Sequence, residues 1–103
     1  MDRIDALRAM LEADPANHFA RYGLAHEFAK RGNDSKALEE FGRILEEDPD
    51  YQAAYYHAGK TLERMNCPDK ARDTYQQGID ASHRTGDAHA CAELEEALAL
   101  LSD

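Results

Sequence analysis

The side chains that most often carry enzyme chemistry occur in this sequence at spacings that do not build an active site. His26 and Glu27 begin the His-Glu-x-x-His pattern of zinc-dependent proteases, but Lys30 stands where the second histidine ligand is required. We find no glycine-rich phosphate loop and no nucleophile elbow. Acid–base catalysis needs two carboxylates held in a cleft, and the carboxylates here are expected on solvated helix faces. The sequence therefore predicts a protein without catalytic activity or cofactor.

The two cysteines and five histidines do not indicate a metal site. Cys67 and Cys91 lack the spacing of metal ligands, and the first residues do not resemble a signal peptide, so we expect reduced thiols. The histidines are scattered along the chain. We expect His57 and Lys60 to be surface residues and predict no bound metal.

Length and charge limit the possible partners. A chain of 103 residues with 43% hydrophobic and 32% charged residues is typical of one globular domain. Its net charge of −9 repels phosphate, so we expect neither nucleic acid nor an anionic membrane as partner. The acidity predicts a solvated surface, or alternatively an adaptation to high salt. With no apolar run long enough to span a bilayer, a cytoplasmic protein is expected.

An internal repeat organises the chain. Residues 10–15 return as residues 44–49, an offset of 34, with leucine, glutamate, aspartate and proline in register. A fixed period of this length indicates helical repeats that bury their apolar faces against one another. Further pairs at the same offset are Ala20 with Ala54, Tyr22 with Tyr56, Lys36 with Lys70, and Ala37 with Ala71.

Apolar residues at spacings of three and four predict an all-α chain. Asn17 and Asp87 are candidate helix N-caps, as is either Asn33 or Asp34, and Gly32 and Asn66 suit the left-handed position that ends a helix. Short loops require consecutive helices to be antiparallel. We expect six helices over about residues 3–13, 18–31, 35–47, 51–65, 68–82 and 88–101.

The helix registers predict the core. Gly59 lies inside a helix, where glycine costs about 1 kcal/mol relative to alanine, so we expect a neighbouring helix to pack closely there. In the last helix the inward residues are predicted to be Cys91, Leu94, Leu98 and Leu101. The main core is predicted to contain Phe41 and Tyr75, packed with Leu24, Phe28 and Leu62.

These residues resemble the tetratricopeptide repeat, whose pattern is W-x2-L-G-x2-Y, then A-x3-F, then P. The first full copy reads Arg21, Leu24, Ala25, Phe28, Ala37, Phe41 and Pro49. The second has His83 at the proline position and otherwise reads Tyr55, Ala58, Gly59, Leu62, Ala71 and Tyr75. The resemblance implies a right-handed helical solenoid with a leading half-repeat (1–15), two repeats (18–51 and 52–85) and a capping helix (86–103).

Several positions depart from the family pattern. Arg21 replaces the large aromatic, and Glu93 and Glu96 stand where a small residue and an aromatic are typical, so the last helix is interpreted as a polar-faced cap. Some family members hold a C-terminal carboxylate with paired lysines and asparagines. Tyr22 and His26 occupy the first such pair of positions here, so we predict no clamp of that kind.

The resemblance also implies a concave groove lined by the first helix of each repeat. At about 100° per residue, Tyr22 and His26 point away from the inward stripe, as do Tyr56 and Lys60. Exposed aromatic residues beside cations are typical of binding surfaces. The alternative is that Tyr22 and Tyr56 only fill the contact between repeats. The predicted peptide-binding residues are Phe19, Tyr22, His26, Lys30, Tyr56, Lys60, Glu63 and Arg64.

The resemblance favours a non-catalytic protein–protein interaction module. We expect a protein or peptide partner, bound in the groove, whose carboxylates meet the groove cations. The alternative is a structural module that associates with itself, or one end of a longer scaffold. Ile4, Leu7, Met10 and Leu11 lack the helix that normally precedes theirs, so weak homo-oligomerisation through the N-terminal helix is expected.

Overall fold

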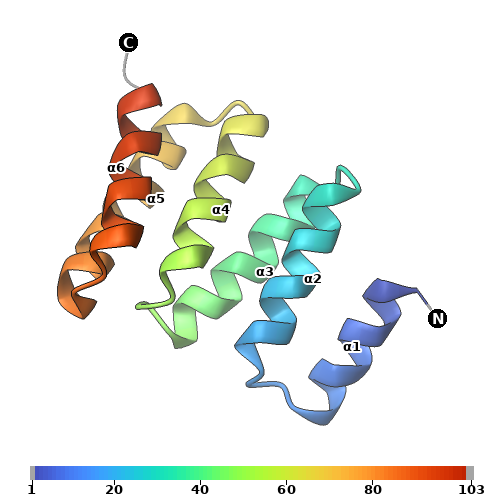
Figure 1. Ribbon diagram of the computed structural model, residues 1–103. Helices are drawn as coiled ribbons and strands as arrows, with labels where there is room; N and C mark the ends of the chain where they lie inside the picture. Colours follow the sequence, from blue (N-terminus) through green and yellow to red (C-terminus); the bar gives the residue numbers. More distant parts are fainter. Residues whose placement is uncertain (1, 102–103) are drawn as a thin grey trace.

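A computed structural model describes residues 2–101; Met1 and the last two residues assigned to the cap, Ser102 and Asp103, lie outside the described part. The described chain is all-α, as predicted (Figure 1). Its helices are α1 (Arg3–Ala13), α2 (His18–Lys30), α3 (Asp34–Glu47), α4 (Gln52–Arg64), α5 (Pro68–Thr85) and α6 (Ala88–Leu101).

The predicted helix boundaries agree with the structure except at the end of α5. The Asn17 side chain accepts a hydrogen bond from the Ala20 backbone N–H at 3.0 Å, so it caps α2. Gly32 and Asn66, one period apart, both adopt positive φ, of 79° and 59°. Helix α5 continues beyond residue 82 to Thr85 and ends where Gly86 takes φ 73°. No helix-breaking residue precedes that glycine, so the helix extends to it.

Consecutive helices pack in sequence order and run antiparallel (Figure 1). Helices α2, α4 and α6 lie on the near side of Figure 1, with α3 and α5 behind them, and α4 also contacts α6. The molecule is elongated, with extents of 43 × 29 × 19 Å. Its length follows from the repeat, because each helix pair packs only against its neighbours.

The core forms two hydrophobic clusters, one for each repeat. Phe41 lies in the cluster formed by α1 to α4, and Tyr75 lies in the cluster formed by α4 to α6. Both rings are almost completely buried, as predicted from the register. Leu24 and Phe28 are buried with Phe41, and Leu62 is buried with Tyr75.

Gly59 confirms the expected close approach of two helices. A Cβ atom at this position would lie 2.2 Å from Cε1 of Tyr75, well inside contact distance. The glycine therefore makes room for the tyrosine ring of α5 against the backbone of α4. Its unfavourable helix propensity is compensated by burial of an aromatic side chain.

The two terminal helices are covered to different extents. Helix α6 buries Leu94 and Ala97, while the predicted inward residues Cys91, Leu98 and Leu101 are half-buried against the second cluster. Helix α1 buries Ile4 and Leu7 and half-buries Leu11, but Met10 is 46% exposed. The N-terminal apolar stripe is thus only partly covered in this structure.

Candidate binding surface

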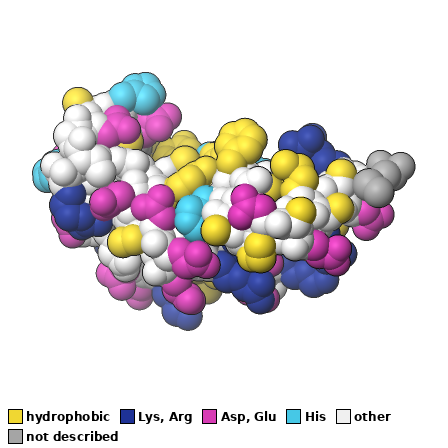
Figure 2. Space-filling model, turned by 90° about the horizontal axis from the view of Figure 1, so that it is seen from below, with side chains coloured by type: hydrophobic (Ala, Val, Ile, Leu, Met, Phe, Trp, Pro, Cys, Tyr) yellow, Lys and Arg dark blue, Asp and Glu magenta, His cyan; other side chains and the backbone are white. Residues whose placement is uncertain are grey.

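Helices α2, α4 and α6 present one side of the molecule as a surface with three hollows. Figure 2 shows hydrophobic side chains gathered along the upper edge, which is the near side in Figure 1, between the α5–α6 lobe and the N-terminal end. Cavities of about 250 and 200 Å³ lie between α4 and α6, and both include Tyr56 and Glu93. A larger cavity of about 650 Å³ lies between α1, α2 and α4.

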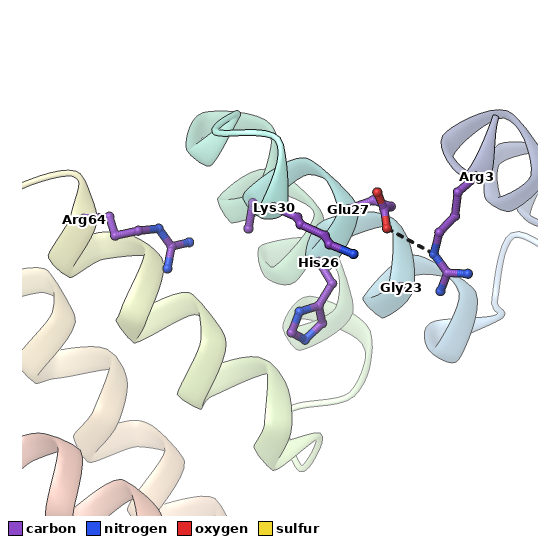
Figure 3. A pocket seen from close by; sticks show the side chains of 7 residues that line it. Arg3, Gly23, His26, Glu27, Lys30 and Arg64 are labelled. Atoms are coloured by element: carbon purple, nitrogen blue, oxygen red, sulfur yellow. Dashed lines mark ion pairs between the residues drawn. The ribbon is translucent and has the colours of Figure 1, made fainter.

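Basic side chains from three helices line the largest cavity (Figure 3). Arg3 comes from α1, Lys30 from the last turn of α2, and Arg64 from the last turn of α4. Arg64 extends from α4 toward α2, and the His26 ring lies between them (Figure 3). Lys30 and Arg64, which the sequence analysis predicted as residues of one groove, line the same cavity.

The cations of this cavity differ in how they are neutralised. Arg3 Nε lies 3.2 Å from Glu27 Oε1, and Arg64 Nη2 lies 3.1 Å from Asp34 Oδ1. Lys30, which is exposed, has no carboxylate within ion-pair distance among residues 2–101. Its ammonium group can therefore meet an external carboxylate without breaking an internal pair.

Tyr22 and His26 belong to an aromatic cluster between α2 and α4. The ring centroids of Tyr22 and Phe41 are 6.0 Å apart, and those of His26 and His57 are 4.2 Å apart. Tyr22 also contacts the ring of Tyr51 at 5.7 Å. These half-buried rings fill the contact between repeats, so the packing interpretation accounts for part of the predicted site.

Burial shifts the pKa values of this cluster. Desolvation raises the pKa of Tyr22 and lowers that of His26. Desolvation is also the main cause that lowers the pKa of His57 to about 4, and the neighbouring His26 and Arg64 lower it further. Both histidines are therefore neutral near pH 7 and act as aromatic packing groups.

The expectation that His57 is a surface residue is wrong. Its ring is half-buried and stacks on Phe41, with centroids 6.2 Å apart and an interplanar angle of 18°. The sequence contained a signal for this position. His57 lies three residues after Ala54 and four before Thr61, and both of these are buried, so helical spacing places it beside the inward stripe.

On α4, Tyr56 and Lys60 form the central part of the surface. Lys60 Nζ lies 5.5 Å from the centroid of the Tyr56 ring and 3.8 Å from Glu63 Oε2. Glu63 also accepts a hydrogen bond from the buried Tyr75 hydroxyl. Desolvation and this carboxylate raise the pKa of Tyr75. Glu63 therefore supports the core as well as the surface, which makes it less available to a partner than predicted.

The edges of the surface contain one predicted residue and several that the sequence did not identify. Phe19, at the start of α2, is 77% exposed and outside the aromatic contacts of Tyr22. Arg3 and Glu27 line the largest cavity, but their meeting depends on the packing of α1 against α2. From α6, Glu93, Glu96 and the exposed Leu100 face Tyr56 and Lys60 across a small cavity. The two glutamates had appeared only as departures from the repeat pattern.

Neither a metal centre nor a membrane span is found in the described part of the chain. Between residues 2 and 101, no three histidine, cysteine, aspartate or glutamate side chains are grouped closely enough to hold a metal ion. Over the same range, each helix is too short or too polar to cross a bilayer.

We compared the sequence and the structure with those of known proteins, and the matches belong to one family. The tetratricopeptide repeat family profile matches residues 1–62. A TPR repeat-containing protein of Pseudomonas aeruginosa is 30% identical over 91 residues, which cover 88% of this chain and 87% of the relative. A tetratricopeptide repeat domain protein of Salinibacter ruber, solved in solution, is 43% identical, with 86% of this chain and 90% of that one covered and a TM-score of 0.82.

A solved protein of Bordetella parapertussis is 28% identical, with 99% of this chain and 89% of that one covered and a TM-score of 0.85. Its match spans all the helices described here, including α6. The repeat period, the sequential packing of antiparallel helices and these relatives agree. This chain belongs to the tetratricopeptide repeat family.

Proposed function

We propose that the surface formed by α2, α4 and α6 binds an extended or helical segment of a partner protein that carries carboxylates. Tetratricopeptide repeat domains are generally protein–protein interaction modules, and the family is typically non-catalytic. The observation that carries the proposal is the cavity of about 650 Å³ in which Lys30 is unpaired beside Arg3 and Arg64.

The contrast between this cavity and the rest of the chain supports an acidic ligand. The protein carries a net charge of −9, so it repels most acidic proteins at a distance. In the concave site, Arg3 and Arg64 are paired with carboxylates, and Lys30 contributes a positive charge that has no internal partner. A carboxylate placed there gains a partner in Lys30, whereas a misaligned acidic segment meets repulsion.

The remaining residues of the surface restrict which side chains the partner segment can carry. Phe19 and Tyr56 offer aromatic area at low entropic cost, which suits an apolar side chain in the segment. Glu93 and Glu96 face the same surface from α6 and repel further carboxylates. The acidic residues of the partner therefore lie over α2 and α4, with neutral or basic residues toward α6. A short segment bound this way is expected at micromolar strength, about 8 kcal/mol.

Charge reversal at matched lysines tests the proposal. The probe is a set of synthetic 12-residue peptides that share a central leucine and differ in the number and position of aspartates, measured by fluorescence polarisation. Lys30→Glu is expected to weaken the best binder about tenfold or more, because a like charge replaces the partner of its carboxylate. Lys70→Glu, on the opposite helix α5, makes the same change in net charge and is expected to bind like wild type.

Equal weakening by both variants would show only a response to net charge and would contradict the proposal. NMR chemical-shift mapping of the bound peptide gives a second outcome. Shifts concentrated on α2 and α4 support the assigned surface, and shifts concentrated on α3 and α5 overturn it.

A double variant separates binding from packing. Tyr56→Ala with Lys60→Ala is expected to abolish peptide capture while the circular dichroism spectrum and melting temperature stay nearly unchanged. Both side chains are half-buried on α4 and contact each other, and Tyr56 also packs against the second hydrophobic cluster. Unfolding of this variant would instead assign them to packing between the repeats.

Self-association is a second candidate function, favoured by the 46% exposure of Met10 on the uncovered side of α1. We expect weak dimerisation that Met10→Glu removes, as measured by sedimentation velocity over a range of concentrations. A strict monomer at high concentration would eliminate this function.

A further inference from the structure

A thiol–imidazole pair lies at the junction of α5 and α6, apart from the proposed binding surface. Cys91 Sγ is 3.3 Å from Nε2 of His83. His83 belongs to the last turn of α5, and Cys91 follows the Asp87 cap of α6 by four residues. The Gly86 turn brings the two helices together, so the contact depends on the fold and not on sequence spacing alone.

The pair opens into its own cavity of about 480 Å³. Cys91, Ala92 and Glu95 line it from α6, whereas Glu93 and Leu94 face the cavity shared with α4. The cavity is thus on a different face of α6 from the binding surface. Its lining includes the carboxylates of Asp87 and Glu95 and no lysine or arginine.

We propose that Cys91 is a reactive thiol that forms mixed disulfides with neutral or cationic low-molecular-weight disulfides, with His83 as the proton acceptor. The thiolate is the attacking form of cysteine, and an imidazole nitrogen 3.3 Å from the sulfur is placed to accept the thiol proton. The carboxylates of Asp87 and Glu95 line the same cavity and repel anionic reagents.

Thiol–disulfide exchange at Cys91 needs no reactant other than the incoming disulfide. The Cys91 proton passes to His83 Nε2, and the sulfur attacks one sulfur of the incoming disulfide. A bond forms to that sulfur while the original sulfur–sulfur bond breaks. The departing thiolate takes the proton from the imidazolium, so Cys91 is oxidised and the leaving half of the reagent is reduced.

Cys67 supplies an internal comparison. It is also half-buried and directly precedes α5, but its thiol donates to the carbonyl oxygen of Met65, at the end of α4, over 3.6 Å. A carbonyl cannot accept a proton as a base does, so this contact does not activate the thiol. Cys91 is therefore expected to react before Cys67.

The test follows modification by cystamine at pH 7 with intact-mass spectrometry. In the Cys67→Ser background, His83→Gln is expected to slow modification about tenfold, because the glutamine side chain cannot accept the thiol proton. The neutral reagent 2-hydroxyethyl disulfide should show a similar decrease. An unchanged rate in His83→Gln with both reagents, or faster modification of Cys67 than of Cys91 in the wild-type chain, would overturn the proposal.

Charge selectivity gives a readout that simple exposure of Cys91 does not produce. Cystamine is expected to react faster than the anionic glutathione disulfide, and Glu95→Gln should reduce that ratio. Hydrogen exchange at α6 in each variant checks that the helix remains docked. An equal rate for the two reagents in wild type, or a ratio unaffected by Glu95→Gln with α6 docked, would refute the assigned role of the carboxylates.

Discussion

The two repeats use different side chains to satisfy the same backbone group. In the first repeat, Arg21 Nη2 donates to the Pro15 carbonyl oxygen at 3.3 Å. In the second, the Tyr55 hydroxyl donates to the Pro49 carbonyl oxygen at 2.7 Å. Both donors reach the residue six positions earlier, at the turn before the first helix of the repeat. The equivalent proline carbonyl therefore accepts a hydrogen bond in both repeats, from a guanidinium in the first and from a phenol in the second.

The surroundings of these donors differ accordingly. Arg21 forms a 2.6 Å ion pair with Glu40 of α3, and the two side chains are only 13% and 12% exposed. One period after Glu40 stands Thr74, whose hydroxyl bonds to the Lys70 carbonyl within its own helix. A charged donor placed at this position needs a carboxylate on the neighbouring helix, and a tyrosine does not.

A second difference concerns the aromatic core. The first repeat pairs Ala25 with Phe41, and the second pairs Gly59 with Tyr75. The smaller residue of α4 allows the larger ring, whose hydroxyl then reaches Glu63. Volume and polarity thus change together across the repeats.

The largest expected effect is loss of a core ring. Phe41→Ala should lower the free energy of unfolding by about 3–5 kcal/mol, because it leaves a cavity between α2, α3 and α4. Denaturant unfolding measures this, with Tyr75→Ala as the equivalent in the second repeat. A much smaller loss at Phe41 than at Tyr75 would show that the two clusters do not contribute equally.

Breaking the Arg21–Glu40 pair should be the next largest change. Glu40→Ala leaves a poorly solvated guanidinium unpaired, at a cost of about 2–4 kcal/mol. The double variant Arg21→Tyr with Glu40→Thr installs the residues of the second repeat and should lie within about 1 kcal/mol of wild type. Comparable destabilisation in both variants would mean that the tyrosine arrangement does not transfer between repeats.

Gly59→Ala should destabilise by about 1–3 kcal/mol, because the added methyl group meets the Tyr75 ring. Combining it with Tyr75→Phe recreates the alanine–phenylalanine pair of the first repeat and frees the ring from Glu63. The double variant is expected to be more stable than the sum of the single changes predicts. Strict additivity in a double-mutant cycle would disprove this coupling.

The smallest effect is a pH dependence from His57, whose counterpart one period earlier is Gly23. Its pKa is about 4 in the fold and 6.5 ordinarily, so the unfolded chain binds the extra proton between these values. Its contribution is therefore fully present above pH 6.5 and is lost as the pH falls toward about 4.

His57→Phe keeps an aromatic ring without the titration. The unfolding free energy of wild type minus that of this variant should be constant above pH 6.5 and should decrease at lower pH, because wild type loses stability there. Urea unfolding at pH 7.5 and pH 5 measures it. A difference that stays constant, or that favours wild type in acid, would refute the assigned burial of the imidazole.

Local patterns in the sequence determined the helices and most of the core. Apolar spacing, the Asn17 cap and the left-handed residues Gly32 and Asn66 each depend on neighbours within about four positions, so they can be recognised without a fold. The period then predicted the burial of Phe41 and Tyr75, because equivalent residues in a repeat meet equivalent neighbours.

Only the tertiary structure decided which polar side chains meet. Arg21 and Glu40 are 19 residues apart, and Arg3 reaches the cavity from α1, so no repeat spacing relates these residues to their partners. Lys30 and Arg64 are one period apart and were predicted as residues of one groove. His57 was misjudged although its helical spacing placed it beside the inward stripe, because the ring that it stacks on, Phe41, comes from α3. Long polar side chains reach partners several ångströms from their own helix, and that distance is set by how the helices pack rather than by the period of the sequence.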